Sequence, residues 1–502
     1  MSFQKGIDRE QTLLFPVSIE EMIPKEHPVR IIDLFIGPLD LQKLGFIEAG
    51  SAVEGRPAYD PKDLLKLYLY GYLNRIRTSR LLERECERNV EVMWLLKGLK
   101  PCFRTIAGFR STNSEGLKNL FRYFVQVMKK WNLVAGETIA IDSSKFRAVN
   151  SKKNNFNPRK VERQLKYIDN KIEEYLIELT LADEQDRSST EINQNILTQL
   201  GRQEKYLEIK RRLEESGEDQ ISTTDPDARS MILHGSVIEV AYNVQTAVDD
   251  KNKLIVHFEA TNDNDRKALH GVALETKQVL GKDKITALAD KGYHNAEQLH
   301  ACKEDDIVTY VAVPEIPRKN EIPTEQYYGD KFIYDESTDQ YSCPQGNAMS
   351  SNGNWYEKKY KNYVTKIKQY RTPTCEHCPV RSQCTTNARG RILERSQYAK
   401  ALEENGSRIK YDLKKYLLRQ QIVEHPFGTI KRQWNMDHIL LKGIKKNNGE
   451  FGLIYFTYNF RRIINIFGFT EFIKRLHRLF LLIYSRWCFT VVNSFDFRFC
   501  YY

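Results

Sequence analysis

Two short apolar runs, each closed by an aspartate, constrain the fold more than any other feature of the sequence. Thr138–Ile141 is followed by Asp142, and Ile285–Ala289 is followed by Asp290. Short apolar runs of this kind are typical of buried strands, and the end of a strand is where an α/β sheet presents ligands and catalytic groups. A helical pattern near 265–280 lies between them. These observations predict an α/β fold class in which Asp142 and Asp290 are candidate catalytic residues.

The charge and composition of the chain limit what it can bind. The 502 residues include 77 Lys or Arg against 66 Asp or Glu, a net charge of +11. Such an excess favours a polyanionic partner, and nucleic acid is the leading candidate. Hydrophobic residues make up 41% of the chain, enough to exclude disorder of the whole protein. We see neither a signal-peptide layout nor an uncharged apolar run of the ~20 residues that span a bilayer, so we expect a cytoplasmic protein.

The N-terminal part, residues 1 to about 130, reads as helical and basic. Asp60 and Pro61 suit the N-cap and first position of a helix. The short helices expected after it carry five scattered arginines: Arg75, Arg77, Arg80, Arg84 and Arg88. This layout predicts either a DNA-binding helix-turn-helix or an ordinary helical bundle with a solvated basic face, and the pattern alone favours neither.

Two segments look inserted into the α/β pattern. In the first, 155–230, apolar residues recur at helical spacing over 165–179 and again over about 190–215, which predicts a helical hairpin. Dimerisation, DNA contact and a merely solvated hairpin all remain open for it. A β-hairpin is expected directly afterwards, from Val237–Val248 and the returning strand Lys253–Phe258.

The second segment, 305–400, is rich in cysteine. Four thiols fall there: Cys343, Cys375, Cys378 and Cys384. Four thiolates can hold a tetrahedral structural Zn²⁺, and the Cys375-x2-Cys378 pair has the spacing of a metal knuckle. The x5 spacing to Cys384 is less regular, so a set of reduced cysteines is the alternative, and His377 is a substitute ligand.

A third carboxylate, Glu424, lies seven residues before Lys431. In a helix this spacing is about two turns, so the carboxylate and the cation would share a face. Together with Asp142 and Asp290, Glu424 would suit Mg²⁺, which takes oxygen ligands and can stabilise both the attacking and the leaving oxygen of a phosphodiester displacement.

The sequence segments around these residues resemble those of the DDE transposases of bacterial insertion sequences, and in particular those of the insertion-sequence family numbered eleven-eighty-two. The resemblance covers about residues 10–470. Its most specific pieces are Gly55–Pro61, Leu81–Cys86, Ile139–Lys145, Asp225–Arg229, Ala241–Val248, Ala289–Tyr293 and Val423–Arg432.

This resemblance implies a ribonuclease H-like catalytic domain over 136–470, which contains both insertions, behind an N-terminal helical DNA-binding domain. Asp142, Asp290 and Glu424 would be its acidic triad and would hold Mg²⁺ or Mn²⁺. Lys431 and Arg432 would contact phosphate. Relatives place Arg four residues and Tyr seven residues before the Glu, whereas this chain has Arg419 and Tyr416, each displaced by one.

The implied activity is transposition of DNA. The enzyme would cut at the ends of its own mobile element and join the 3′ ends to target DNA by two-metal phosphoryl transfer. Its partners would be the terminal inverted repeats, target DNA and a second copy of itself, in a bacterial nucleoid. The aromatic tail 476–502 departs from relatives. It keeps open a catalytically inactive or repurposed transposase that only binds DNA, and a nuclease that cuts without joining is a further alternative.

Overall fold

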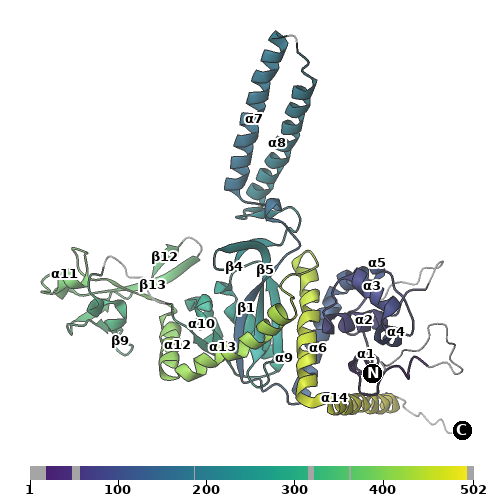
Figure 1. The fold of residues 1–502 in the computed structure, drawn as a ribbon. Helices are drawn as coiled ribbons and strands as arrows, with labels where there is room; N and C mark the ends of the chain where they lie inside the picture. Colours follow the sequence, from purple (N-terminus) through teal and green to yellow (C-terminus); the bar gives the residue numbers. More distant parts are fainter. Residues whose placement is uncertain (1–17, 48–56, 186, 315–321, 361–362, 495–502) are drawn as a thin grey trace, which may run out of the picture.

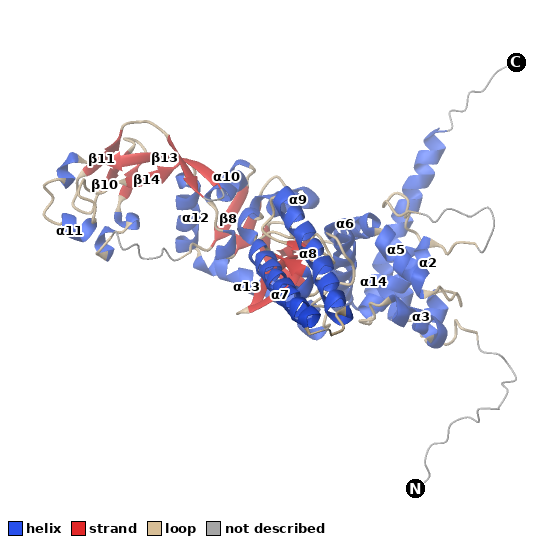
Figure 2. Ribbon diagram, turned by 90° about the horizontal axis from the view of Figure 1, so that it is seen from above, coloured by secondary structure: helices blue, strands red, loops and turns tan. Residues whose placement is uncertain are grey.

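The computed structural model describes residues 18–47, 57–185, 187–314, 322–360 and 363–494. They form a central α/β core, a helical unit beside it, a long two-helix arm and a small β-rich unit on the other side of the core (Figure 1). Seen from above, the β-rich unit, the core and the helical unit lie in a row (Figure 2). Within the described residues no helix is both long enough and apolar enough to cross a membrane.

The core is built on one mixed six-stranded sheet. Its strands follow the order β4-β5-β1-β7-β8. Strand β6 also pairs with β5, along the part of that long strand that β4 does not cover. The strand bounds are β1 (Thr138–Arg147), β4 (Arg229–His234), β5 (Val237–Asp249), β6 (Ile255–Thr261), β7 (Ile285–Ala289) and β8 (Ile307–Val311). The pairs β1–β5, β4–β5 and β5–β6 are antiparallel, whereas β1–β7 and β7–β8 are parallel. The predicted α/β class and the predicted hairpin are thus confirmed.

Strand β1 is longer than the sequence indicated. We expected it to end at Asp142, but it continues to Arg147 because its antiparallel pairing with β5 runs from Ile139 through to Arg147. Its pairing with β7 stops at Ala140, and Asp142–Lys145 are only partly buried, whereas Ile141 and Phe146 remain buried. Asp142 therefore lies where β1 loses one neighbouring strand, and this gives its side chain the exposure that a strand end would have given.

Helices cover the sheet and carry the later site residues. Near the sheet are η2 (Asp265–Lys267), α9 (Leu269–Leu280), η3 (Lys291–Tyr293), α10 (Ala296–Glu304), α12 (Ala399–Tyr411), α13 (Leu413–Phe427) and the π-helix η7 (Gly428–Gln433). Helix α13 contacts β1, α10 and α12 contact β8, and α9 contacts β6. The long α14 (Ile444–Ser494) also packs on β6 and is kinked at Gly468, where φ is +71°.

The N-terminal unit is helical, as predicted, and its described residues form six helices. They are α1 (Pro28–Ile36), α2 (Pro61–Leu73), α3 (Ser79–Arg88), α4 (Val90–Leu95), α5 (Phe103–Thr112) and α6 (Ser114–Lys130). The expected start of α2 is present, because the Asp60 side chain accepts from the Lys62 N–H and Pro61 opens the helix. Helices α2 and α6 pack against α14, so the first and last parts of the chain share one core.

A buried ion pair joins the N-terminal unit to α14. The carboxylate of Glu450, on α14, is fully buried and lies 2.7 Å from the Arg77 guanidinium and 3.9 Å from that of Arg110. It also accepts a hydrogen bond from the Tyr72 hydroxyl at 3.2 Å. Arg77 is therefore not one of the exposed basic residues that the sequence pattern grouped together, whereas Arg80, Arg84 and Arg88 are exposed.

The first insertion forms the arm that stands clear of the core in Figure 1. Its helices are α7 (Pro158–Glu184) and α8 (Thr190–Ser216), and its base holds η1 (Lys152–Asn154), β2 (Asn155–Phe156) and β3 (Ile221–Ser222). A small apolar cluster closes the base, with Phe156, Val161, Ile209, Leu213 and Ile221 buried together. The predicted helical hairpin is confirmed.

The second insertion folds as a separate six-stranded antiparallel sheet. Its strands are β9 (Ile333–Asp335), β10 (Gln340–Ser342), β11 (Ala348–Ser351), β12 (Tyr356–Tyr360), β13 (Tyr363–Arg371) and β14 (Leu393–Ser396). Short helices accompany it: η4 (Glu325–Tyr327), η5 (Gly329–Lys331), η6 (Pro373–Cys375) and α11 (Arg381–Cys384). The expected start at 305 is too early, because Ile307–Val311 is the edge strand β8 of the core.

The C-terminal segment 476–502, expected to be atypical, is described only in part. Leu476, Leu479 and Phe480 are buried and belong to the main apolar core. The helix α14 continues to Ser494, and 495–502 lie outside the described residues.

The buried ion pair leads to a stability prediction. Glu450→Gln removes the anion but leaves Arg77 and Arg110 buried, so the free energy of unfolding should fall by about 3–5 kcal/mol. Equilibrium urea unfolding at neutral pH measures this change.

A matched control lies on the same helix. Glu471 pairs with Arg475 at 2.7 Å, four residues on, and both side chains are partly exposed. Glu471→Gln should cost less than about 0.5 kcal/mol. Equal losses in the two variants would show that Glu450 does not dock the N-terminal unit.

Candidate active site

The three predicted carboxylates come from three elements around one side of the sheet. Asp142 lies within β1, Asp290 follows β7, and Glu424 is on α13, which contacts both of these strands. Asp290 caps η3, where its Oδ1 accepts from the Gly292 N–H at 2.9 Å. Asp142 and Asp290 lie close enough for their charges to interact: burial raises the pKa of Asp142 to about 6, and the Asp290 carboxylate adds to the rise. The carboxylates of Asp142 and Asp290 are thus brought together from positions far apart in sequence, and Glu424 lies on the helix that packs on both of their strands.

A cation of the protein itself, the Arg419 guanidinium, forms an ion pair with Asp142. The Arg419 guanidinium lies 3.2 Å from Asp142 Oδ2 and opposes the rise in the pKa of that carboxyl. One helical position further, the Gln420 amide donates to Glu424 Oε1 at 2.7 Å. The one-residue displacement of Arg419 left its role unassigned from sequence, yet the structure places its side chain in the site.

Sequence reasoning missed a fourth carboxylate, that of Asp265. Its Oδ1 accepts hydrogen bonds from the buried amides of Asn243 and Gln245, both at 2.7 Å. Its Oδ2 lies on the side of Asp290: a Cβ placed on Gly292 would be 3.7 Å from Asp265 Oδ2 and 3.0 Å from Asp290 Oδ1. Asp263 is a nearby aspartate on the same loop, and nothing in the residue pattern distinguishes Asp265 from it.

Below these carboxylates is a buried polar layer. The Tyr293 hydroxyl hydrogen-bonds to Gln245 Oε1, and Tyr293 is fully buried. Burial raises the pKa of Tyr293 well above its usual range, and the carboxylates of Asp265, Asp142 and Asp290 add to this effect. Tyr293 is therefore part of the buried support beneath the site.

Lys431 points into the molecule, toward β1. Its ammonium donates to Ser144 Oγ at 2.9 Å and to the Lys145 carbonyl at 2.6 Å. The expected α-helical spacing from Glu424 does not hold, because α13 ends at Phe427, directly after Pro426, and continues as a π-helix. Such π-helical turns are frequent at functional sites. Burial lowers the pKa of Lys431 to about 8, whereas Arg432 is exposed.

His425, directly after Glu424, has structural partners of its own. His425 Nδ1 lies 2.8 Å from the Tyr458 hydroxyl, and its Nε2 lies 3.2 Å from the Arg462 guanidinium. Tyr458 in turn donates to the Lys253 carbonyl at 2.8 Å. These contacts hold α13 against α14 and β6, which is a positioning role.

Two cavities flank the loop that carries Asp263 and Asn264. One, of about 540 Å³, lies between this loop and the β-rich unit and is also lined by Arg266, Lys267 and His294. The other, of about 650 Å³, lies toward the base of the arm and is also lined by Lys145. The surface is therefore hollowed on both sides of this loop, although the four carboxylates of the site line neither cavity.

The four cysteines of the second insertion line one small cavity of about 30 Å³. Burial raises the pKa of Cys384, and neighbouring thiols of Cys375, Cys343 and Cys378 add to the rise. Asn347 donates to Cys343 Sγ at 3.7 Å. The structure thus brings together all four residues of the predicted zinc set, while His377 does not line this cavity.

Neither site is already closed around a metal. In the part of the chain that the structure describes, no three His, Cys, Asp or Glu side chains are grouped as a metal ion would require. At the carboxylates, Arg419 pairs with Asp142 and the Gln420 amide donates to Glu424. The donors themselves are all carboxylate oxygens, the ligand type that Mg²⁺ and Mn²⁺ prefer.

Comparison with known proteins gives two family matches. Residues 17–112, which include α1–α5, match a family described as "Transposase domain (DUF772)". Residues 342–464 match one described as "Transposase DDE domain", a stretch that contains the four cysteines, Glu424 and Lys431. Asp142 and Asp290 lie outside both matches. No curated protein is significantly similar to the chain.

A solved structure with some likeness is that of the piggyBac transposase synaptic complex with hairpin DNA. It is 10% identical, with a TM-score of 0.30, over 94% of this chain and 83% of that one. At this TM-score the likeness establishes no common fold. The two family matches, in contrast, show a DDE domain behind an N-terminal transposase domain. The chain is accordingly a DDE-type transposase, an enzyme of DNA transposition.

Proposed function

We propose that this enzyme cleaves DNA at the ends of its own mobile element and joins the freed 3′ ends to target DNA. The observation that carries the proposal is that Asp142 and Asp290 lie close enough to interact, while Glu424 lies on the helix that packs on their strands. Two of them come from adjacent parallel strands, and the third comes from a helix that contacts both strands. Asp265 adds a fourth carboxylate beside Asp290.

The core sheet supports the assignment of a ribonuclease H-like domain. Three antiparallel strands, β6, β5 and β1, are extended by the two parallel strands β7 and β8. Helices flank the sheet. Neither insertion places a strand between neighbouring strands of this sheet. This arrangement fits the ribonuclease H-like core that the sequence resemblance implies.

The triad would hold Mg²⁺ or Mn²⁺. When bound, such ions lower the pKa of a coordinated water and neutralise charge on the transferring phosphate. The chain's own residues prepare the site: Asp265 is fixed by two amides, and Asp290 is fixed by the Gly292 N–H. Arg419 would leave Asp142 as the triad closes, and its guanidinium would then be free to pair with phosphate.

Lys431 and Arg432 would contact the DNA backbone next to the triad. Arg432 is exposed and always charged, so it can reach phosphate directly. Lys431 is tied to Ser144 and Lys145, two and three residues after Asp142. A phosphate bound by Lys431 would therefore lie beside β1, the strand that also carries Asp142.

The more specific parts of the proposal rest on the sequence resemblance. We propose membership of the insertion-sequence family numbered eleven-eighty-two, action on terminal inverted repeats and target DNA as a homodimer, and a place in the bacterial nucleoid. The exposed arginines of α3, Arg80, Arg84 and Arg88, support the N-terminal unit as a DNA-binding domain.

A structural Zn²⁺ is proposed for the second insertion. Cys343, Cys375, Cys378 and Cys384 line one cavity and supply four sulfur donors, the ligand set of closed zinc sites. Among its described residues, the surrounding sheet has a small apolar core of Phe332, Met349, Tyr370 and Leu393, so a metal would add to its stability.

The function is tested by cleavage and joining on a labelled duplex that carries the inverted repeats flanking the reading frame. Asp290→Asn should lower cleavage by about 10³-fold or more, because the loss of a metal ligand removes several kcal/mol of transition-state stabilisation. DNA binding, measured by gel shift, should be nearly unchanged.

Asp283→Asn is the matched control, because Asp283 is exposed in the turn before β7. It should cut and join like the wild type. Equal cleavage by Asp290→Asn would reject the triad. Cuts without joined products from the wild type would reveal a nuclease, and binding without any cut would reveal an inactive or repurposed transposase.

The buried ammonium of Lys431 predicts a pH dependence of end binding. Because its pKa is lowered to about 8, Lys431 loses its charge as pH rises through that value, and affinity for the cleaved end should fall. A bound phosphate would move the midpoint upward. Fluorescence anisotropy across pH measures the effect.

Lys431→Arg is the control for this prediction, because arginine stays charged over the whole range. Its affinity should vary less with pH than that of the wild type, whereas Lys431→Met should bind weakly at every pH. Identical pH profiles for all three proteins would show that Lys431 does not contact the end.

Elemental analysis of the purified protein tests the zinc proposal. The wild type should carry one zinc per chain, and Cys378→Ser should lose most of it. Cys102→Ser is the control, because Cys102 is exposed and lies outside the second insertion. Unchanged zinc content in Cys378→Ser would defeat the proposal.

A further inference from the structure

The arm formed by α7 and α8 exposes more apolar surface than a two-helix hairpin needs. Each helix has 27 residues, yet only Val161, Ile168, Ala182, Ile209 and Leu213 are buried. Seven large apolar side chains are exposed instead: Tyr167, Leu176, Ile177, Leu181, Leu197, Leu200 and Leu207. Ile177 and Leu197 are 59% and 62% exposed. Exposed apolar surface gathered on one element marks an interaction site.

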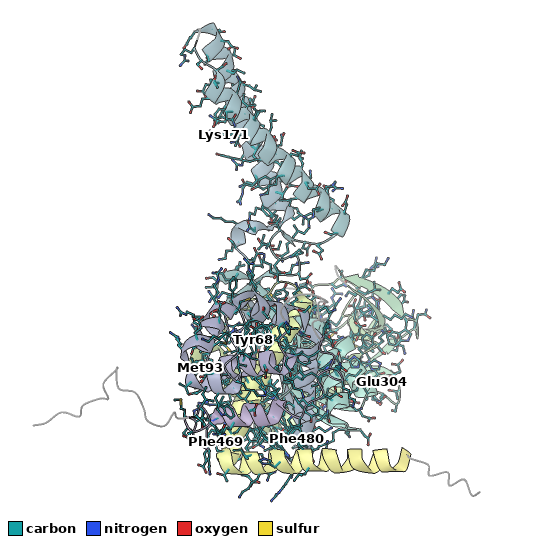
Figure 3. The ribbon with its side chains drawn as sticks, turned by 90° about the vertical axis from the view of Figure 1, so that its right-hand side faces the viewer. Tyr68, Met93, Lys171, Glu304, Phe469 and Phe480 are labelled. Carbon is teal, nitrogen blue, oxygen red and sulfur yellow. The ribbon has the colours of Figure 1, made fainter. Side chains whose placement is uncertain are left out.

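These side chains form stripes at helical spacing. Ile177 and Leu181 are four residues apart on α7, and Leu200 and Leu207 are seven apart on α8, so each pair shares a helix face. Figure 3 shows the arm, marked by Lys171, standing away from the rest of the molecule. The stripes are therefore open to a partner over the length of the arm.

The charge of the arm indicates what that partner is. The outer half, 172–203, has seven acidic and two basic residues, whereas the inner parts, 158–171 and 204–216, together have six acidic and nine basic residues. An acidic outer half repels DNA, so a nucleic acid is a poor occupant. A second copy carries the same acidic outer half and basic inner parts. If its arm lay antiparallel to the first, unlike charges would face each other.

We propose that the arms of two copies pack antiparallel as a four-helix bundle. This arrangement covers the exposed stripes and sets the acidic outer half of each arm against the basic inner half of the other. Such a contact is a closed two-fold interface, in which both copies use one surface. The inference rests on the proposed homodimer and names the surface that forms it.

The geometry has a consequence for the complex. A helix of 27 residues is about 40 Å long, so antiparallel arms would hold the two cores about one arm length apart. The contact uses no residue that lines the two cavities beside the Asp263–Asn264 loop, because residues of α7 and α8 line neither cavity.

The oligomeric state of the full-length protein, measured by sedimentation without DNA or metal, tests the proposal. The wild type should be a dimer, and Ile177→Glu with Leu200→Glu should weaken dimerisation by at least about tenfold, because each places a charge in an apolar contact. Ile333→Glu is the control, since Ile333 is 72% exposed on the β-rich unit, and it should remain dimeric. Circular dichroism checks that the helices persist.

A charge swap tests the antiparallel order. Glu178→Lys with Asp183→Lys should weaken the dimer, and adding Arg163→Glu with Arg159→Glu should restore it, because in antiparallel arms these positions oppose one another and again differ in sign. A monomeric wild type, an unchanged dimer in the Glu variants, or a failed rescue would each overturn the proposal. So would arm variants that lose DNA affinity without any change in oligomeric state. Since the readout involves no cleavage, failure here is distinct from failure of the proposed chemistry.

Discussion

The two-sided pairing of strand β1 is the constraint on which the rest of the site depends. Its antiparallel ladder with β5 continues to Arg147, whereas its parallel ladder with β7 ends at Ala140. The first ladder aligns the strand that supplies Asn243 and Gln245, the amides that hold Asp265. The second ladder sets Asp290 beside Asp142. Beyond Ala140 the exposed edge of β1 receives Arg419 and Lys431, so every charged group of the site is placed relative to this one strand.

Carboxylates gathered in this way repel one another unless a cation lies among them. In the structure Arg419 takes that place at Asp142, and burial still raises the pKa of Asp142 to about 6. A divalent ion would satisfy the same need more fully, because it can bind several carboxylates at once. A single guanidinium thus stabilises Asp142 in this structure, and the proposed metal would take over that role. The buried Glu450 illustrates the same rule away from the site, where Arg77 and Arg110 surround a lone carboxylate.

Local patterns in the sequence predicted those parts of the molecule that local physics decides. Apolar runs located β1 and β7, the Asp60–Pro61 cap located α2, and helical periodicity located the arm. Contacts between distant residues could not be predicted in this way. Arg77 looked like a surface residue because its partner, Glu450, is 373 residues away. The continuation of β1 past Asp142 was missed because Ser143–Lys145 carry no apolar alternation. Lys431 turned inward because α13 becomes a π-helix, a change for which Pro426 is the one local sign.

The central claim is that the carboxylates form a metal-dependent catalytic site, and a change of metal specificity tests it most directly. Asp290→Cys replaces a hard oxygen ligand by a soft sulfur, so cleavage of the end duplex should be lost in Mg²⁺ and recovered in Mn²⁺. The wild type, assayed beside it, should cut in both. Recovery confined to Mn²⁺ would establish that Asp290 binds the catalytic ion. Full activity of the variant in Mg²⁺, or no activity in either metal while the wild type cuts, would contradict the account.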